Sequence, residues 1–169
     1  MKKKTLTRLG IIAILTVSLF AILCSCVPQM GESEEEKALK ANREYTTEAN
    51  RLIDSLSSEL GSFTEAVSEE NHVKMNTYSD NAKAIIAELK VLEVPEDLKV
   101  IHVEYLTGCI ELSKALDAYT ALYTAMNSAT EENPFDYSTF DEELGKIKKT
   151  YDSGIKHLET GDKKALEMP

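Results

Sequence analysis

The chain has 169 residues, of which 43% are hydrophobic and 28% charged, and its formal net charge is −10 at pH 7. This length supports one hydrophobic core and argues against two ordinary domains, and the hydrophobic content argues against a disordered chain. Nucleic-acid binding depends on clustered Lys and Arg, which the acidic part of the chain after residue 25 lacks, so we expect no nucleic-acid partner.

The charge is unevenly distributed along the chain. Residues 1–25 contain four of the 19 basic residues and no acidic residue, which leaves 15 basic against 29 acidic residues in the rest. The remainder therefore carries a net charge near −14, and anionic lipid headgroups repel a surface of that sign. We do not expect the body of the protein to adhere to a membrane through its charge.

The N-terminus has the pattern of a secretory signal. A basic stretch, Met1–Arg8, precedes an uncharged run, Leu9–Leu23, whose length is typical of the apolar region of a signal peptide. A membrane-spanning helix usually needs about 20 apolar residues. The pattern predicts a signal peptide over residues 1–25, with an uncleaved membrane anchor extending through Val27 as the alternative.

The apolar run ends in Leu23-Cys24-Ser25-Cys26. This sequence resembles the lipobox of bacterial lipoproteins, with a Leu three residues before the modified cysteine and a small residue directly before it. Cys24 fits the pattern less well, because the bulky Leu23 precedes it. The resemblance covers the first 26 residues. It implies that a diacylglyceryl group is attached to the Cys26 thiol, that the chain is cut before Cys26, and that the new amino group is often acylated.

The same resemblance implies a place in the cell. Two or three acyl chains hold a protein stably on a membrane, whereas one chain holds it only marginally. Because basic residues stay on the cytoplasmic side, the domain is expected on the extracytoplasmic face of a bacterial cell membrane, with residues 26–32 as the lipidated cysteine and tether. Cleavage would remove Cys24 and lipidation would use the Cys26 thiol, so Cys109 would be the one free cysteine and no internal disulfide is expected. The apolar residues around Cys109 in the sequence predict that it lies in the core.

From Ser33 onward, apolar residues recur every three or four positions, which indicates amphipathic helices over a domain of residues 33–165. Ser33 and Glu36 form a capping-box pattern at the first helix, and a turn is predicted near residues 68–73. The apolar stripes run over residues 45–67, 75–92, 98–126 and 140–158.

The helix boundaries follow from local signals. Pro95 fits the first position of the third helix. Asp136 is predicted to cap the fourth helix, with Phe135 and Phe140 forming a hydrophobic staple, and Gly161 to end it.

Helices of this length joined by short loops bury their stripes when they pack about one axis. The sequence therefore predicts an all-α fold, an up-down-up-down four-helix bundle. The alternative is a three-helix bundle in which the first two helices form one continuous rod.

The search for chemistry finds no catalytic motif, and we expect neither an enzyme nor a bound cofactor or metal. A di-iron bundle needs two Glu-x-x-His pairs on different helices, whereas this chain has only Glu69 with His72, at a predicted turn. The Cys-x-x-Cys-His pattern of haem attachment is absent.

Four aromatic residues form a candidate pocket. Tyr45, Tyr78 and Tyr105 occupy stripe positions, and His102 flanks the stripe of its helix. Either their polar groups reach water at the bundle edge, or they line an internal pocket for a small ligand. Gly108, inside the third helix, indicates close approach of a neighbouring helix or of a ligand.

These features predict a membrane-anchored, non-catalytic lipoprotein whose helical domain binds an envelope protein or a small ligand. The alternatives are a metal- or cofactor-binding bundle with an interior lined by His and Tyr, and a structural spacer of the envelope. An exposed apolar patch would favour binding of a protein partner, and an enclosed aromatic cavity would favour binding of a small ligand. A dry core with a polar surface would favour the role of a spacer.

Overall fold

The computed structural model describes residues 33–168. The predicted signal peptide (residues 1–25), the proposed lipid site Cys26 and the tether to residue 32 lie outside the described residues. Among the helices that are described, none is both long enough and apolar enough to cross a membrane.

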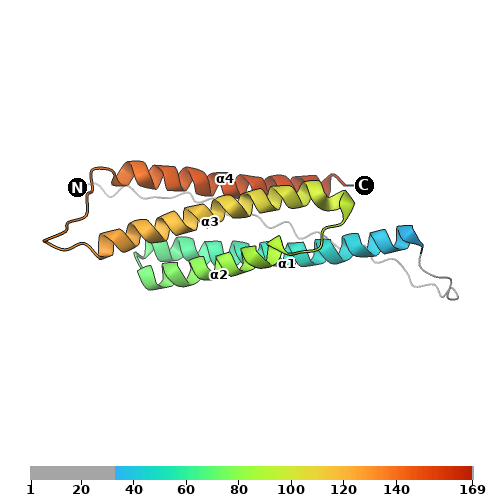
Figure 1. Cartoon of the computed structure of the whole chain (residues 1–169), viewed down its shortest axis with the longest axis horizontal. Helices are drawn as coiled ribbons and strands as arrows, with labels where there is room; N and C mark the ends of the chain where they lie inside the picture. The colour runs from blue at the N-terminus through green and yellow to red at the C-terminus, as the bar shows by residue number, and fades with distance from the viewer. Residues whose placement is uncertain (1–32, 169) are drawn as a thin grey trace. The chain divides into compact units, whose positions relative to one another are not determined.

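The described chain forms four α-helices: α1 (Glu34–Ser68), α2 (His72–Lys90), α3 (Lys99–Asn127) and α4 (Phe140–Leu166). A short 3-10 helix, η1 (Glu96–Leu98), precedes α3, and residues 33–168 contain no strand. Each helix packs against the next one along the chain (Figure 1). The prediction of an all-α, up-down four-helix bundle is confirmed.

The turn between α1 and α2 decides against a single rod. Glu70 has a positive φ of 53°, and its N–H donates to the Val67 carbonyl (3.1 Å) while the Asn71 N–H donates to the Ala66 carbonyl (2.9 Å). These two bonds are the Schellman motif that ends many helices. The Asn71 side chain then accepts a hydrogen bond from the Lys74 N–H (3.1 Å), which caps α2. One tight turn within the predicted residues 68–73 therefore ends α1 and begins α2.

The other helix starts follow local capping rules in part. The capping box of α1 is present: Ser33 Oγ accepts from the Glu36 N–H (3.2 Å), and Glu36 Oε2 accepts from the Ser33 N–H (2.9 Å). Pro95 does not occupy the first helical position as predicted, because its backbone is extended (ψ 148°) and it precedes η1. The last turn before α3 is thus a 3-10 turn.

Both ends of α4 differ from the prediction. Asp136 does not cap the helix; its Oδ1 accepts from the Ser138 N–H (2.8 Å) and stabilises a turn, and α4 begins at Phe140 after Thr139. The rings of Phe135 and Phe140 still meet edge to face, 6.2 Å apart. Gly161 does not end α4, which continues to Leu166.

The core follows the predicted stripes. All stripe positions of α1 from Tyr45 to Phe63 are buried, and Cys109 and Leu112 on α3 are fully buried. Burial raises the pKa of the Cys109 thiol to about 12, so this thiol behaves as an apolar core group. Further buried apolar residues lie beside the predicted stripes: Ile53, Ala66, Ile86, Ala115 and Leu122.

Glycines bring α3 and α4 into close contact. A Cβ atom on Gly108 would lie 2.7 Å from the Gly154 carbonyl oxygen, and one on Gly154 would lie 2.7 Å from Leu112 Cγ. A Cβ on Gly161 would lie 2.5 Å from Cε1 of Tyr105. Of the two interpretations of Gly108, the structure shows the close approach of a helix.

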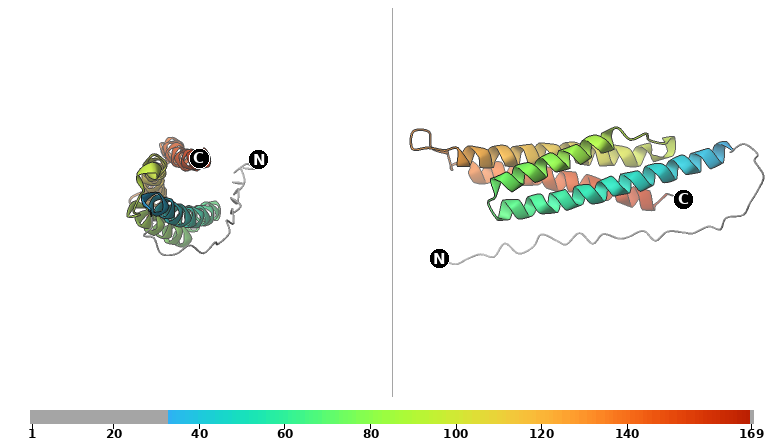
Figure 2. Two further views of the ribbon diagram at one scale, coloured as in Figure 1. Left: turned by 90° about the vertical axis from the view of Figure 1, so that its right-hand side faces the viewer. Right: turned by 90° about the horizontal axis from the view of Figure 1, so that it is seen from below.

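Figure 2 shows the helices end on, with α2 and α3 between α1 and α4. Packing between α1 and α4 is slight beside the packing of consecutive helices. The central helix α3 therefore carries much of the assembly, because it contacts α2 on one side and α4 on the other.

Candidate functional site

A buried polar contact between Tyr45 and His102 joins α1 to α3. A hydrogen bond links the Tyr45 hydroxyl to His102 Nδ1 (3.0 Å), and the two rings meet edge to face at a centroid distance of 5.7 Å. Both side chains are buried. Burial lowers the pKa of His102 below its ordinary value and raises that of Tyr45 to about 12, so both groups are neutral at pH 7.

Tyr45 also forms one wall of an open hollow of about 390 Å³ between α1 and the segment that joins α2 to η1. The lining residues are Ala41, Glu44, Tyr45, Glu48, Leu92, Glu93, Val94 and Pro95. Five of the eight are apolar or aromatic and three are glutamates. The hollow thus combines an apolar surface with an acidic rim.

Only one of the three rim carboxylates is neutralised by a described residue. Arg51 donates to both oxygens of Glu48 (Nε to Oε2, 3.0 Å; Nη2 to Oε1, 2.6 Å) and lowers the pKa of that carboxyl. Within residues 33–168, Glu44 and Glu93 have no ion-pair partner among the salt bridges of the bundle. Two negative charges at the rim therefore remain available to a cation.

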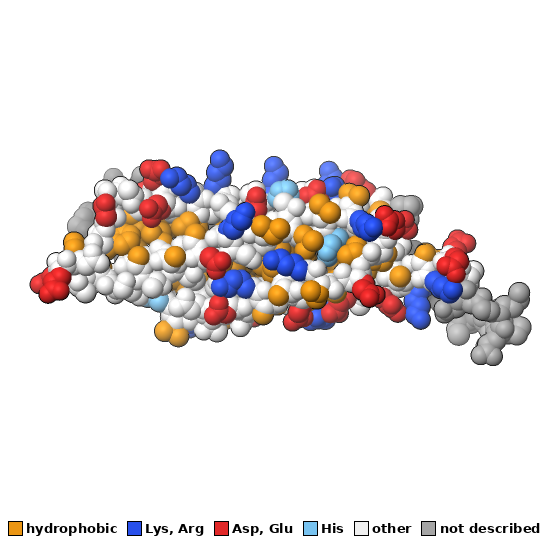
Figure 3. All heavy atoms as spheres, viewed as in Figure 1, with side chains coloured by type: hydrophobic (Ala, Val, Ile, Leu, Met, Phe, Trp, Pro, Cys, Tyr) orange, Lys and Arg blue, Asp and Glu red, His pale blue; other side chains and the backbone are white. Residues whose placement is uncertain are grey.

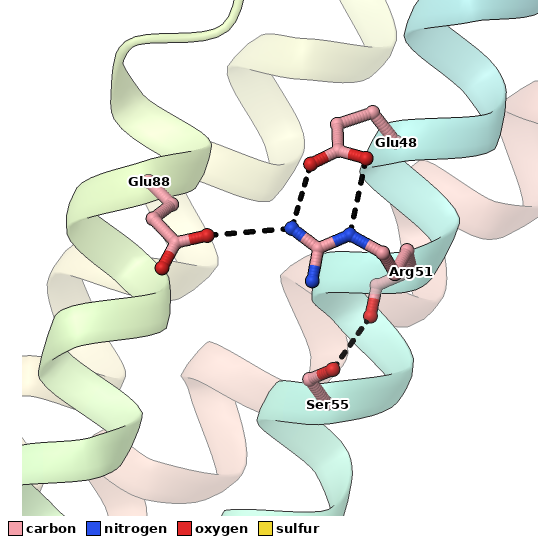
Figure 4. A network of polar contacts seen from close by, with 4 residues as sticks. All are labelled: Glu48, Arg51, Ser55 and Glu88. Carbon is pink, nitrogen blue, oxygen red and sulfur yellow. Dashed lines mark hydrogen bonds and ion pairs between the residues drawn. The ribbon is translucent and has the colours of Figure 1, made fainter.

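A polar network around Arg51 connects the rim residue Glu48 on α1 to α2 (Figure 4). Arg51 Nη2 also donates to Glu88 Oε2 on α2 (3.3 Å), and the Ser55 hydroxyl donates to the Arg51 carbonyl (2.9 Å). All these groups are largely exposed, so each ion pair contributes little to stability. Their effect is to orient Glu48, since its carboxylate is bound at both oxygens.

The other predicted pocket residues do not line this hollow. The Tyr105 hydroxyl donates to Asp162 Oδ1 on α4 (2.8 Å), so its polar group is used in the contact between α3 and α4. Asn81 bonds Glu59 across α1 and α2, and this register places Tyr78 about 25 Å along the bundle from Tyr45. The four residues therefore form separate contacts, with Tyr45 and His102 in direct contact.

A second charged cluster joins α3 to α4. Glu104 accepts hydrogen bonds from His157 Nδ1 (2.8 Å) and from Lys164 Nζ (2.6 Å), and both donors lower the pKa of its carboxyl. Because an ionised carboxylate only accepts, Nδ1 of His157 carries the proton in this contact. With both carboxylate oxygens bound, this cluster fastens the two helices.

The structure offers no arrangement for a metal within the described residues, where no three His, Cys, Asp or Glu side chains are placed to hold one. Glu69 caps the end of α1 and His72 begins α2, where its ring lies 5.8 Å from that of Tyr123 on α3. The buried, neutral Tyr45 and His102 suit packing and hydrogen bonding. The geometry of the hollow suits binding of a basic and partly apolar group.

The hollow could not be found from the sequence, although two of its parts carried a signal. Pro95 is predicted to mark a helix boundary, and its extended backbone lies in the segment that forms one side of the hollow. Glu44 and Glu48 lie four residues apart on one helix face beside Tyr45. Their meeting across α1 and the α2 to η1 segment is a tertiary contact that no local spacing encodes.

Comparisons with known proteins give no match to a protein-family model, to a curated protein or to a solved structure.

Proposed function

We propose that this chain is a lipoprotein anchored at Cys26 on the extracytoplasmic face of a bacterial membrane, and that its bundle binds a basic segment of an envelope protein without catalysis. The observation that carries the binding part is the hollow beside Tyr45. The anchor part is supported by the resemblance of residues 23–26 to a lipobox.

The chemistry of the hollow selects the class of ligand. Glu44 and Glu93, which have no ion-pair partner within residues 33–168, present carboxylates beside Leu92 and Val94, so a Lys or Arg side chain with an apolar neighbour satisfies both surfaces. Ligand pockets commonly enclose most of a small molecule, whereas this hollow is open to solvent. A chain segment that lies across an open surface fits it better than a free small molecule.

The position of the hollow agrees with the anchor. Tyr45 lies twelve residues after the capping residue Ser33, in the first half of α1. A tether from Cys26 to Ser33 spans at most about 25 Å when fully extended. The proposed lipid anchor would therefore hold the start of α1 near the membrane, within reach of neighbouring envelope proteins.

The first experiment tests the anchor. The intact mass of the membrane-extracted protein is measured beside that of a Cys26→Ser variant. We expect the wild-type mass to correspond to residues 26–169 plus acyl groups and the variant to lack them. An uncleaved, unacylated chain in both samples would show a transmembrane anchor and would overturn the lipoprotein proposal.

The second experiment tests the hollow, independently of the anchor. Full-length protein in detergent is titrated with the dipeptide amide Lys-Leu and, as a charge control, with Glu-Leu, and backbone amide shifts are recorded by NMR. We expect saturable shifts with Lys-Leu at residues 41–48 and 92–95. Glu44→Gln combined with Glu93→Gln should weaken binding about tenfold or more.

Glu131→Gln combined with Glu132→Gln, in the loop between α3 and α4, is the matched control, because it also removes two charges at exposed positions away from the hollow. It should leave the Lys-Leu titration unchanged. Shifts spread over all acidic surfaces, or equal loss in the control variant, would indicate general attraction to a negative protein and would contradict the proposed site.

A further inference from the structure

The exposed face of α3 carries an apolar seam that the bundle does not use. Val100, Val103 and Ile110 are 63%, 59% and 45% exposed. With Thr107 they recur at intervals of three, four and three residues, the spacing by which one helix packs on another in a coiled coil. The Thr107 hydroxyl donates to the Val103 carbonyl (2.8 Å), which leaves its methyl group for packing. Figure 3 shows apolar side chains among charged ones on the face that α3 crosses.

Charged residues extend the seam at both ends. Lys114 follows Ile110 by four residues, and Glu96 precedes Val100 by four. Lys114 is exposed and has no ion-pair partner within residues 33–168. Glu96 binds Lys99, and both of these side chains are largely exposed. The Glu96 end, in the 3-10 helix η1, therefore carries an exposed carboxylate that also binds Lys99, and the Lys114 end carries an exposed ammonium group.

Two copies of this seam are complementary to each other when they run in opposite directions. If two copies of α3 pair antiparallel about Tyr105, Val100 of one copy faces Ile110 of the other, and Val103 faces Thr107. In the same register Glu96 faces Lys114 at both ends. Parallel pairing would instead place Lys114 against Lys114 and Glu96 against Glu96, which is repulsive.

We infer that this seam is a self-association surface, on which a second copy of the chain packs antiparallel through α3. The pairing is isologous, because the same residues contribute on both copies. It does not involve the hollow and does not rest on the function proposed above. A seam of this length buries less than the roughly 800 Å² per partner of a stable complex, so the dimer is weak and is favoured where the chain is concentrated.

Cysteine cross-linking tests the register. Full-length chains carrying Val103→Cys and Thr107→Cys are mixed in detergent, oxidised mildly and analysed as disulfide-linked peptides by mass spectrometry. Cys24 and Cys26 are replaced by serine in both chains, and the native Cys109 is fully buried, so no native thiol competes. We expect disulfides between positions 103 and 107 to exceed those between two positions 103 by at least about fivefold, because antiparallel pairing holds the latter too far apart.

A charge exchange tests the ends of the seam. Lys114→Glu and Glu96→Lys should each reduce the dimer fraction in sedimentation about tenfold, and the double variant should restore it. Lys148→Glu, exposed on α4, controls for the charge change of Lys114→Glu, and Glu159→Lys, also exposed on α4, controls for that of Glu96→Lys. Circular dichroism checks that each variant folds. The cross-linking would overturn the inference if disulfides between two positions 103 dominated, or if no disulfide exceeded the level found in unfolded chains. The charge exchange would overturn it if Lys148→Glu or Glu159→Lys caused an equal loss of dimer, or if the double variant did not restore the dimer.

Discussion

Tyr45 and His102 show how a titratable side chain is kept in an apolar core. His102 is 7% exposed, and its Nδ1 is satisfied by the Tyr45 hydroxyl. A buried imidazole is tolerated when it is neutral and hydrogen bonded, because the charged form would lose its hydration. The buried site therefore favours the unprotonated form of His102, although the Tyr45 hydroxyl can donate to or accept from Nδ1.

Acidification is expected to weaken the fold through His102. Burial lowers the pKa of this side chain in the folded state below the ordinary value of 6.5, so below about pH 6.5 the unfolded chain binds more protons than the folded one. Stability is then complete above the unfolded pKa and is lost as the pH falls toward the folded pKa. Urea unfolding between about pH 7.5 and pH 5 should show this decrease.

His102→Gln is the variant that isolates this effect, since glutamine can accept the Tyr45 hydrogen bond but does not titrate. Its free energy of unfolding should fall less than that of the wild type over the same pH range. Equal decreases in the two proteins would assign the pH dependence to the carboxylates instead of to His102.

At the scale of the helices, the turn from α1 to α2 contains a strained residue. Glu70 adopts a left-handed backbone conformation, which costs a residue with a Cβ atom about 1 kcal/mol and costs glycine much less. Glu70→Gly should therefore stabilise the folded protein by about 0.5 to 1 kcal/mol, measured by urea unfolding. Glu69→Gly, at a right-handed position beside it, is the control and should destabilise. A loss of stability in Glu70→Gly would show that the turn is not strained.

Replacing a glycine by alanine is expected to destabilise the protein at the contact between α3 and α4 and to stabilise it at an open helix position. Gly108→Ala places a methyl group 2.7 Å from the backbone of α4, so the helices must separate, and we expect a loss of about 1 to 3 kcal/mol. Gly61→Ala, with no atom within 4 Å of the added carbon, should gain about 1 kcal/mol from helix propensity. Thermal unfolding of both variants compares the two sites. A gain in both would mean that α3 and α4 are not closely packed in solution.

Much of the helical fold could be predicted because amphipathic periodicity is local. The buried positions from Tyr45 to Phe63 were readable from their three- and four-residue spacing alone. The wrong prediction at Gly161 arises where a tertiary contact competes with a local signal, because this glycine makes room for the Tyr105 ring instead of ending α4. In the same way, Glu104 and His157 are 53 residues apart in sequence, and no spacing rule brings them together.

On the scale of the whole molecule, α4 is held by less apolar burial than its neighbours. It contains four buried residues, of which two are glycine, whereas α1 contains eight and α3 nine. Its first buried residue is Ile147, seven positions after the helix begins. The close packing of α4 on α3 thus relies on its later turns, around Gly154 and Leu158.

Hydrogen exchange should reveal this difference. In the native protein, amides of residues 140–146 are expected to exchange by local opening faster than amides of residues 52–63, which lie in the middle of α1. Exchange followed by mass spectrometry of the intact, folded chain measures both segments in one sample. Equal protection of the two segments would show that the bundle opens only as a whole.

The preference of each helix for its chain neighbour also bears on assembly. When each helix packs mainly on its chain neighbour, most contacting residues are close together in the sequence, which favours rapid folding. The hairpin of α1 and α2 needs nothing from α4 to begin, since its turn is built from residues 66–74. A chain delivered from its N-terminus can thus build its bundle progressively, each new helix adding to a surface that the previous ones have already formed.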